Sequence, residues 1–138
     1  MTSRVLSILV LAAAVSACKS SPTSPSQNVN VPYSATDLRV GTGAEAVNGR
    51  TVTVAYTGWL YDPGAAQNKG RQFDSGQFSF VIGGGGVISG FNQAVNGMRV
   101  GGQRRAVLPP NLAYGSAGSG PIPPNATLVF EIELLNVQ

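Results

Sequence analysis

The sequence predicts an α+β domain built from an antiparallel β-sheet with one short helix on its dry face. Two patterns predict it. Several segments alternate apolar and polar residues, as strands with one buried and one wet face do, and one segment has helical spacing. The 18 glycines and nine prolines favour turns over long helices. At 138 residues and 43% hydrophobic content, the chain suits one domain with a packed core.

The strands are predicted by their period of two. Four segments show it: 51–57, 77–82, 103–108 and 128–134. In the first, Val52, Val54 and Tyr56 share one face while the threonines share the other. In the last, apolar residues point inward, and Glu131 and Glu133 are expected on the solvent face.

The predicted helix covers about residues 89–95 and lies between two of these strands. The apolar residues of this region are Ile88, Phe91, Ala94 and Val95. Their spacing of three, three and one suits a short amphipathic helix that packs on the sheet. Gly97 is expected to end it, because glycine readily adopts the left-handed conformation common after a helix.

Residues 1–17 predict a signal peptide of the lipoprotein type. Arg4 precedes an apolar run from Val5 to Val15, and small residues follow. The run is too short to span a membrane, which takes about 20 residues. The next phrase, Val15-Ser16-Ala17-Cys18, looks like a bacterial lipobox, whose cleavage leaves the only cysteine as a lipidated N-terminus. The alternatives are an ordinary signal with an incidental cysteine, or a buried helix.

Residues 18–33 predict a tether between the lipid on Cys18 and a folded domain spanning 34–138. The tether is rich in Ser, Pro and Asn and has almost no large apolar side chains, so it cannot bury enough surface to fold. Leader, cysteine and tether together predict an exported lipoprotein. It would be anchored at the periplasmic face of a membrane or at the cell surface.

The composition excludes several kinds of chemistry. The chain has no His, which removes the commonest general base and the commonest metal ligand. Its single Cys cannot form an intramolecular disulfide or a Cys-rich zinc site. The basic residues are scattered, and Arg104 and Arg105 are expected to face opposite ways on a strand. We therefore expect no metal, no cofactor and no nucleic-acid partner.

The sequence also lacks the motifs of two enzyme classes, the dinucleotide-binding enzymes and the serine hydrolases. The glycine run 83–86 follows a strand, but Ile88 or Ser89 stands where the third glycine of a dinucleotide-binding fingerprint belongs. A turn is the better interpretation. No G-x-S-x-G occurs, and no His is present to act as the base of a serine hydrolase. The acidic residues offer no obvious catalytic pair.

Short aromatic phrases remain, and they run in order along the chain. They are Tyr56-Thr57-Gly58, Phe73-Asp74-Ser75, Ala113-Tyr114-Gly115 and the segment 122–135, which begins Ile122-Pro123-Pro124. In this order they resemble the FKBP-type peptidyl-prolyl cis-trans isomerases, from about Ser34 to the C-terminus. The resemblance implies a twisted antiparallel sheet wrapped around the short helix, with a pocket between them.

The resemblance also implies the residues of that pocket. Its apolar lining would comprise Phe73, Phe78, Val87, Phe91, Ile122 and Phe130. Asp74, Tyr114, Ile88 and Tyr56 would act on the substrate, with Ile88 offering a backbone N–H to a ligand carbonyl. From spacing alone, Asp74 has an alternative interpretation as a solvent-facing turn residue before Ser75.

Such a pocket suits rotation about an X-Pro bond, which needs neither a nucleophile nor proton transfer. The planar amide is more polar and better hydrated than the twisted one, so apolar walls favour the transition state. The resemblance implies proline-containing protein substrates and a tacrolimus-like macrolide inhibitor, and we expect a monomer. The alternative function is a binding module or surface interaction factor that holds proline peptides without turnover.

The chain departs from the family pattern at the pocket floor and in the loop that overhangs the pocket. Phe91 stands where many members carry Trp at the pocket floor, which affects substrate preference and drug affinity because Phe is smaller and lacks the indole N–H. The only tryptophan, Trp59, is expected away from the pocket. The loop 115–121, which would overhang the pocket, is rich in Gly and Ser and is expected to be mobile and weakly selective.

Overall fold

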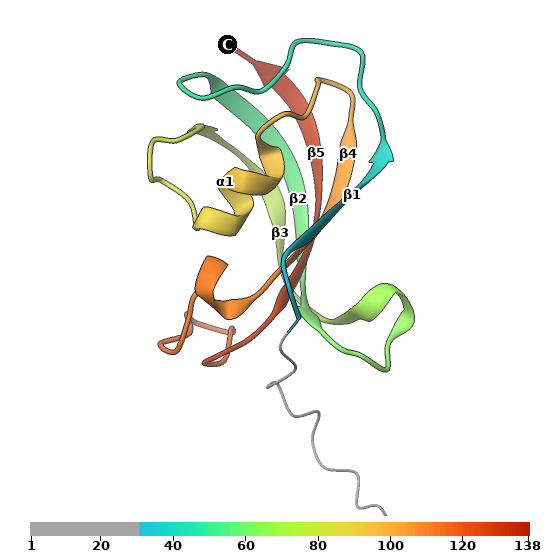
Figure 1. The fold of residues 1–138 in the computed structure, drawn as a ribbon, viewed down its shortest axis with the longest axis vertical. Coiled ribbons are helices and arrows are strands. Elements are labelled where there is room, and N and C mark those ends of the chain that lie inside the picture. The colour runs from blue at the N-terminus through green and yellow to red at the C-terminus, as the bar shows by residue number, and fades with distance from the viewer. Residues whose placement is uncertain (1–30) are drawn as a thin grey trace, which may run out of the picture.

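The computed structural model describes residues 31–138, which form one five-stranded antiparallel sheet and one α-helix (Figure 1). The elements are β1 (Ser34–Arg39), β2 (Thr51–Tyr61), the 3₁₀ segment η1 (Ala66–Asn68), β3 (Lys69–Val81), α1 (Ser89–Val95), β4 (Gln103–Leu108), the 3₁₀ segment η2 (Pro110–Leu112) and β5 (Leu128–Val137). The predicted fold class is confirmed. The predicted signal peptide, the lipidated Cys18 and most of the predicted tether lie outside the described residues.

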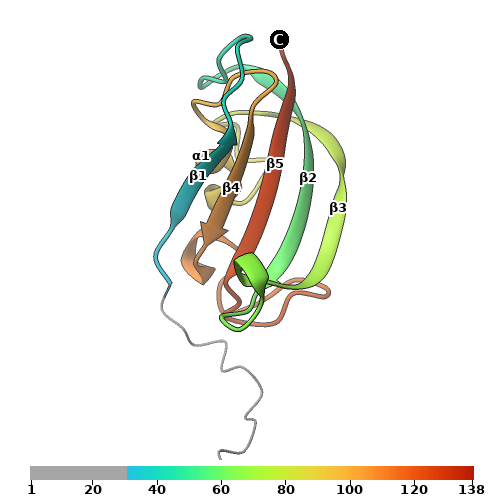
Figure 2. The same ribbon diagram turned by 90° about the vertical axis from the view of Figure 1, so that its right-hand side faces the viewer.

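The strands lie in the order β1-β4-β5-β2-β3, and Figure 2 shows them side by side in this order. Every pairing is antiparallel. The two central strands, β5 and β2, pair over nearly their whole length, with Val54 opposite Leu134 and Leu60 opposite Leu128. These apolar pairs place the buried side chains of both strands on one face, as the alternation in the sequence predicted.

The inner strands β2 and β5 run on to Tyr61 and Val137, past the predicted ends at 57 and 134, and the larger differences from the prediction lie at the edges of the sheet. All six residues of β1 are exposed, so this strand has no buried face and no alternation to detect. β3 begins at Lys69, eight residues before the predicted strand at Gln77, because Phe73 is the one large apolar residue in its first half and no apolar alternation marks it. Edge strands are paired on one side only, so tertiary pairing decides their extent.

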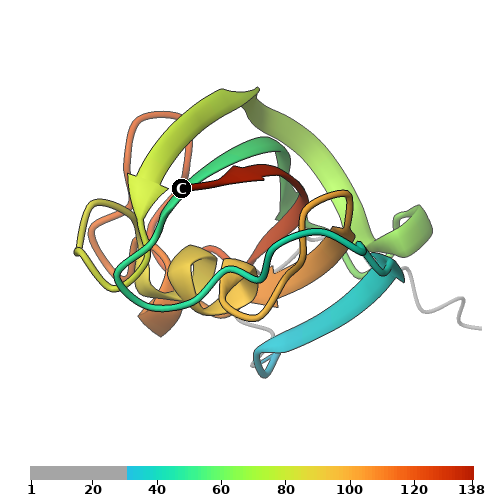
Figure 3. The ribbon, with the colours of Figure 1, turned by 90° about the horizontal axis from the view of Figure 1, so that it is seen from above.

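The helix α1 has the predicted bounds and packs on the concave face of the sheet. Seen from above, the sheet curves around it (Figure 3). The helix buries Gly90, Phe91, Ala94 and Val95, and the core continues into β2, β4 and β5. Gly97 adopts a positive φ of 88° just beyond the helix end, as predicted.

Arg104 fastens this helix to the sheet and to β1. Its guanidinium donates to the carbonyl of Ala94 at 2.8 Å and to that of Asn96 at 3.3 Å, at the C-terminal end of the helix. Its Nε also pairs with Asp37 on β1 at 2.7 Å. A cation at this end of a helix satisfies carbonyls that have no partner within the helix. Arg105 faces the opposite side of the sheet, as predicted, and reaches Glu131.

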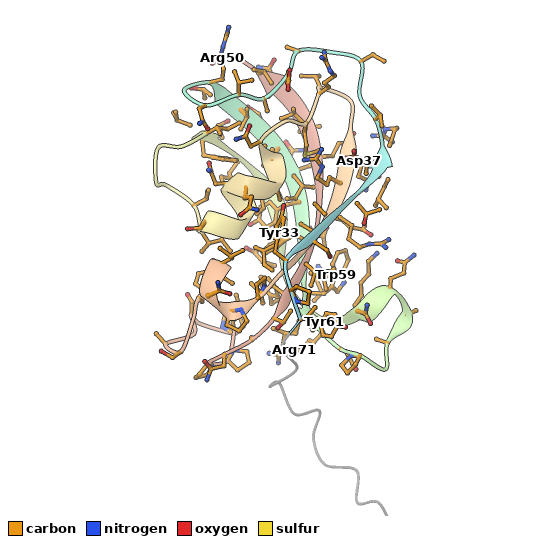
Figure 4. All side chains as sticks on the ribbon, in the orientation of Figure 1. Tyr33, Asp37, Arg50, Trp59, Tyr61 and Arg71 are labelled. Carbon is orange, nitrogen blue, oxygen red and sulfur yellow. The ribbon has the colours of Figure 1, made fainter. Side chains whose placement is uncertain are left out.

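The described chain begins close to the sheet. Tyr33, the last residue of the predicted tether, is partly buried against the core and is labelled in Figure 4. Its burial raises the pKa of its hydroxyl above the ordinary value, and the nearby charge of Arg104 opposes that rise. Within residues 31–138, no helix has the length and apolar content needed to cross a membrane.

Candidate functional site

A pocket of 260 Å³ opens between α1 and the concave face of the sheet. It is lined by Tyr56, Phe73, Asp74, Phe78, Gly86, Val87, Ile88, Phe91, Tyr114 and Phe130. These residues come from β2, β3, the loop 83–88, α1, β5 and the segment after η2. The pocket is thus assembled from segments that are far apart in the sequence.

Phe91 forms the centre of the pocket's aromatic lining. Its ring lies 5.3 Å from that of Phe130 and 5.8 Å from that of Tyr56, both edge to face. It also lies 5.5 Å from the ring of Phe78. Edge-to-face packing at these distances is favourable because the positive ring edge meets the negative face. The side chain is 3% exposed, so it is a buried floor held by its neighbours on several sides.

Gly58 makes room for two of the pocket's rings. A Cβ atom built on Gly58 would lie 2.5 Å from Cζ of Phe73 and 2.8 Å from Cε1 of Phe130. Both distances are shorter than carbon atoms tolerate, so any larger residue here would push the rings apart. The edge-to-face pair of Phe73 and Phe130, 5.6 Å between centroids, therefore depends on a glycine in the middle of β2.

An irregularity in β3 directs two successive side chains into the pocket. Gly58 pairs with Asp74, but the next residue, Trp59, pairs with Gln72, so Phe73 has no partner opposite it. In a regular strand, Phe73 and Asp74 would point to opposite faces. The extra residue of a β-bulge changes this, and both side chains line the pocket. Asp74 lies within β3, so the structure does not support a turn at this position.

Asp74 is held by two hydrogen bonds. Tyr56 donates its hydroxyl to Oδ2 at 2.6 Å, and the backbone N–H of Ser75 donates to Oδ1 at 2.8 Å. Burial is the main cause that raises the pKa of Tyr56 to about 12, and the hydrogen bond to Asp74 and its charge add to it. The phenol thus stays protonated at neutral pH and fixes the carboxylate at the pocket wall.

Two further polar groups face the pocket. The backbone N–H of Ile88 has no hydrogen-bond acceptor among the described residues, and Ile88 lies just before α1 at the pocket lining. Tyr114 is 37% exposed and lines the opposite rim. Its phenol adds an electrostatic contribution, the smallest of the causes, to the raised pKa of Tyr56. A bound carbonyl would thus find donors at the wall and at the rim.

The structure brings together every predicted pocket residue except Ile122. Ile122 is 6% exposed and belongs to the core, and its backbone exchanges two hydrogen bonds with Ser119. Gly86 lines the pocket but was missed by the sequence interpretation, since it contributes only backbone. Its place in the phrase just before Val87 and Ile88 was the available signal.

The loop 115–121 has defined contacts. Gly118 donates its N–H to the carbonyl of Tyr114 at 3.2 Å, and Ser119 forms a short bridge with Ile122. From β3, Arg71 donates to the carbonyl of Pro121 at 3.1 Å. Figure 4 shows Arg71 at the same end of the domain as Tyr61 and Trp59. The predicted mobility of the loop stays a prediction.

The convex face of the sheet carries an ion-pair cluster. Glu131 lies between Lys69, at 2.5 Å, and Arg105, at 3.4 Å, and its side chain is only 17% exposed. It therefore faces outward, as predicted, but is shielded by its partners. The ammonium of Lys69 also lies 4.4 Å from the ring centre of Trp59, a cation–π contact. Trp59 does not line the pocket.

No group of three or more metal-binding side chains gathers within residues 31–138. The pocket offers apolar walls, one carboxylate, two phenols and backbone donors. This set can bind an apolar ring and an adjoining amide.

Known proteins share this architecture. The family model for FKBP-type peptidyl-prolyl cis-trans isomerases matches residues 43–135. The FK506-binding protein of Neisseria meningitidis serogroup A is 43% identical over 107 residues, which are 73% of this chain and 92% of the relative. Among solved structures, FkpA from Escherichia coli is 37% identical with a TM-score of 0.66; the match covers 77% of this chain and 48% of FkpA.

A second solved structure agrees. The peptidyl-prolyl cis-trans isomerase of Pseudomonas syringae is also 37% identical, with a TM-score of 0.65 over 77% of this chain and 75% of that protein. The matched region contains all the strands that build the pocket and the helix at its floor. The chain belongs to the FKBP-type peptidyl-prolyl cis-trans isomerases.

Proposed function

We propose that the pocket above α1 isomerises X-Pro bonds of exported proteins, with the proline ring on Phe91 and the amide beside Asp74. The observation that carries this proposal is the pocket's composition: an aromatic floor and walls, with a fixed carboxylate and an unpaired backbone N–H in the same lining. Membership of the family indicates which reaction is catalysed, and the residues of the pocket indicate how it would proceed.

The reaction requires only that the amide twist. Rotation breaks the resonance of the X-Pro bond and meets a barrier of about 18–20 kcal/mol. The planar amide is stabilised by water more than the twisted one, so a pocket walled by Phe73, Phe78 and Phe130 disfavours the planar form. No proton or electron pair leaves the substrate, which agrees with a chain that has no His.

Three groups would guide the twist. The N–H of Ile88 donates to a carbonyl of the bound peptide and sets its depth. The carboxylate of Asp74, held by Tyr56, faces the twisting amide, whose carbonyl carbon gains positive character as resonance is lost. Tyr114 donates from the rim. Shortening a ~10 s isomerisation to ~1 ms takes roughly 5.5 kcal/mol, which a few such hydrogen bonds and ring burial can supply.

A proline-peptide assay tests this pocket. We expect Asp74→Ala and Tyr114→Phe to lower kcat/KM about tenfold each while the circular dichroism spectrum and thermal midpoint stay close to wild type. Asp62→Ala, which changes a carboxylate at the η1 turn outside the pocket, serves as the matched control. Unchanged rates in both pocket variants would remove Asp74 and Tyr114 from the mechanism.

We also propose that a tacrolimus-like macrolide competes for this pocket. The N. meningitidis relative is an FK506-binding protein, and the lining residues here keep an apolar floor. Because Phe91 lacks the indole N–H of Trp, we expect Phe91→Trp to change macrolide affinity more than it changes peptide turnover. Competition binding with the peptide assay measures both quantities.

We propose that the enzyme works outside the cytoplasm, anchored by a lipid on Cys18. The support lies in the sequence: a signal-like leader of 17 residues, a lipobox-like phrase and a polar tether that would set the domain away from the membrane. A monomer on such a tether needs no further partner to reach exported chains.

Fractionation tests the anchor. The full-length chain expressed in a Gram-negative host should appear in the membrane fraction, and Cys18→Ala should move it to the soluble periplasmic fraction. Ser16→Thr, which keeps the cysteine and a small polar residue before it, is the control. Membrane association that survives Cys18→Ala would overturn the lipid anchor and leave the isomerase assignment intact.

A further inference from the structure

A second hollow adjoins the proline pocket at the outer edge of the sheet. It has a volume of 290 Å³ and is lined by Phe78, Ser79, Phe80, Val81, Gly84 and Gly86. Phe78 and Gly86 line both cavities, so the two hollows lie on either side of a shared wall. A chain that leaves the proline pocket past this wall enters the second hollow directly.

The lining of this hollow suits an apolar side chain. The rings of Phe78 and Phe80 stack at 5.4 Å with an angle of 26°. Val81 is 43% exposed although it is apolar. On the other side the loop 83–86 contributes backbone only, and a Cβ built on Gly86 would meet no atom within 4 Å. The absence of side chains in this loop therefore keeps the hollow open.

The edge of β3 offers backbone partners beside the hollow. Ile82 donates to the carbonyl of Arg50 at 3.0 Å and accepts from the N–H of Gly49 at 2.9 Å, so its backbone groups face the β2 side. Backbone groups alternate in direction along a strand, so those of Ser79 face away from β2. No other strand of residues 31–138 pairs with this edge. The N–H and carbonyl of Ser79 are thus open to an added strand.

We propose that the substrate chain continues from the proline pocket along the edge of β3, pairs with the backbone of Ser79 and places an apolar side chain in the second hollow. The occupant is an extended stretch of the same unfolded polypeptide that presents its proline to the pocket. This inference rests on the proposed function and adds a substrate class to it: X-Pro sites with an apolar residue a short distance from the proline. In such strand addition, hydrogen bonds between backbones provide affinity, and the hollow provides specificity for an apolar side chain.

Peptide binding tests this extension. A short blocked peptide holds only the X-Pro pair, and a longer series carries a single Leu at successive positions on either side of the proline, with Ala elsewhere. For the wild type, we expect one Leu position to tighten Kd about tenfold over the all-Ala peptide, as burial of such a side chain allows. Val81→Asp should abolish this gain.

Two more variants separate the backbone from the side chains. Ser79→Pro removes the edge N–H and should weaken every long peptide, whereas Ser79→Ala keeps that N–H and loses only the 2.8 Å contact between the hydroxyls of Ser79 and Thr53. Val47→Asp changes another exposed valine, 40% exposed, outside both hollows and should leave the Leu gain intact.

The outcomes are distinguishable from failure of the isomerase pocket. If the short peptide is isomerised but no Leu position binds more tightly, or if Val81→Asp keeps the gain, the extension along β3 is wrong and the pocket stands. If the short peptide is not isomerised, the proposed catalytic pocket is wrong. The extension is supported if one Leu position tightens binding and, of the variants, only Val81→Asp and Ser79→Pro reduce that gain.

Discussion

The hydroxyl of Tyr56 lies 2.6 Å from Oδ2 of Asp74 and donates a hydrogen bond to it across the β2–β3 pair. A second donor, the N–H of Ser75, holds the other carboxylate oxygen. With both oxygens engaged, the carboxylate has one orientation at the pocket wall. This contact ties the geometry of the pocket to the pairing of two strands.

Tyr56→Phe should lower kcat/KM about tenfold, because it removes the hydrogen bond that orients the Asp74 carboxylate. A hydrogen bond to a charged group contributes about 1.5–3 kcal/mol, and competition with water at the pocket wall reduces that contribution. The ring and its packing on Phe91 and Phe78 remain. Tyr61→Phe, which removes a phenol outside the pocket, is the matched control. Equal rates for wild type and Tyr56→Phe would show that the carboxylate needs no such support.

The pH dependence of Tyr56 follows from its pKa, raised from 10.0 to about 12. The folded chain keeps this proton at pH values where the unfolded chain has released it. The resulting stability is fully present below about pH 10 and is lost as the pH rises through about 12. Ultraviolet titration of tyrosinate, wild type minus Tyr56→Phe, should show one group ionising near pH 12. A difference curve centred near pH 10 would contradict the raised pKa.

Gly58→Ala should destabilise the domain by about 1–3 kcal/mol, since the added methyl overpacks the space beside Phe73 and Phe130. Urea unfolding measures the free energy, and the peptide assay should show reduced turnover because both rings line the pocket. Gly64→Ala is the control: its Cβ would approach nothing closer than 3.5 Å. If Gly58→Ala and Gly64→Ala lower the free energy of unfolding equally, crowding of the rings at Gly58 does not destabilise the domain.

Arg71→Ala should release the loop 115–121 from β3, since the guanidinium donates to the carbonyl of Pro121. We expect KM to rise about two- to fivefold with little change in kcat, because an exposed hydrogen bond of roughly 0.5–1 kcal/mol holds the overhang and not the reacting amide. Faster amide exchange in residues 116–120 would accompany it. Arg50→Ala, at the opposite end of the domain in Figure 4, is the control. If neither KM nor amide exchange changes in Arg71→Ala, the hydrogen bond from Arg71 does not hold the loop 115–121 in place.

The pocket was largely predictable because the family phrases carry its side chains in order. Tyr56, Phe91 and Phe130 come from β2, α1 and β5, and each was assigned from its own phrase. Ile122 was assigned in the same way, but the structure buries it in the core below the loop. A phrase shows which residues are present, whereas the packing of the loop decides which of them reach the cavity.

By itself the sequence determined the α+β class, the bounds of α1 and the four alternating segments, since each depends on side chains a few positions apart. Most of the pocket residues came instead from the resemblance of its aromatic phrases to the family. Only the tertiary structure showed the bulge by which Phe73 and Asp74, neighbours in one strand, both face the pocket. It alone also showed that Glu131 is shielded between two cations and that a second hollow opens beside Val81. These features arise from strand register, a bulge and contacts between distant segments. No local period encodes them, because each is set by the partner strand and not by the neighbours in the chain.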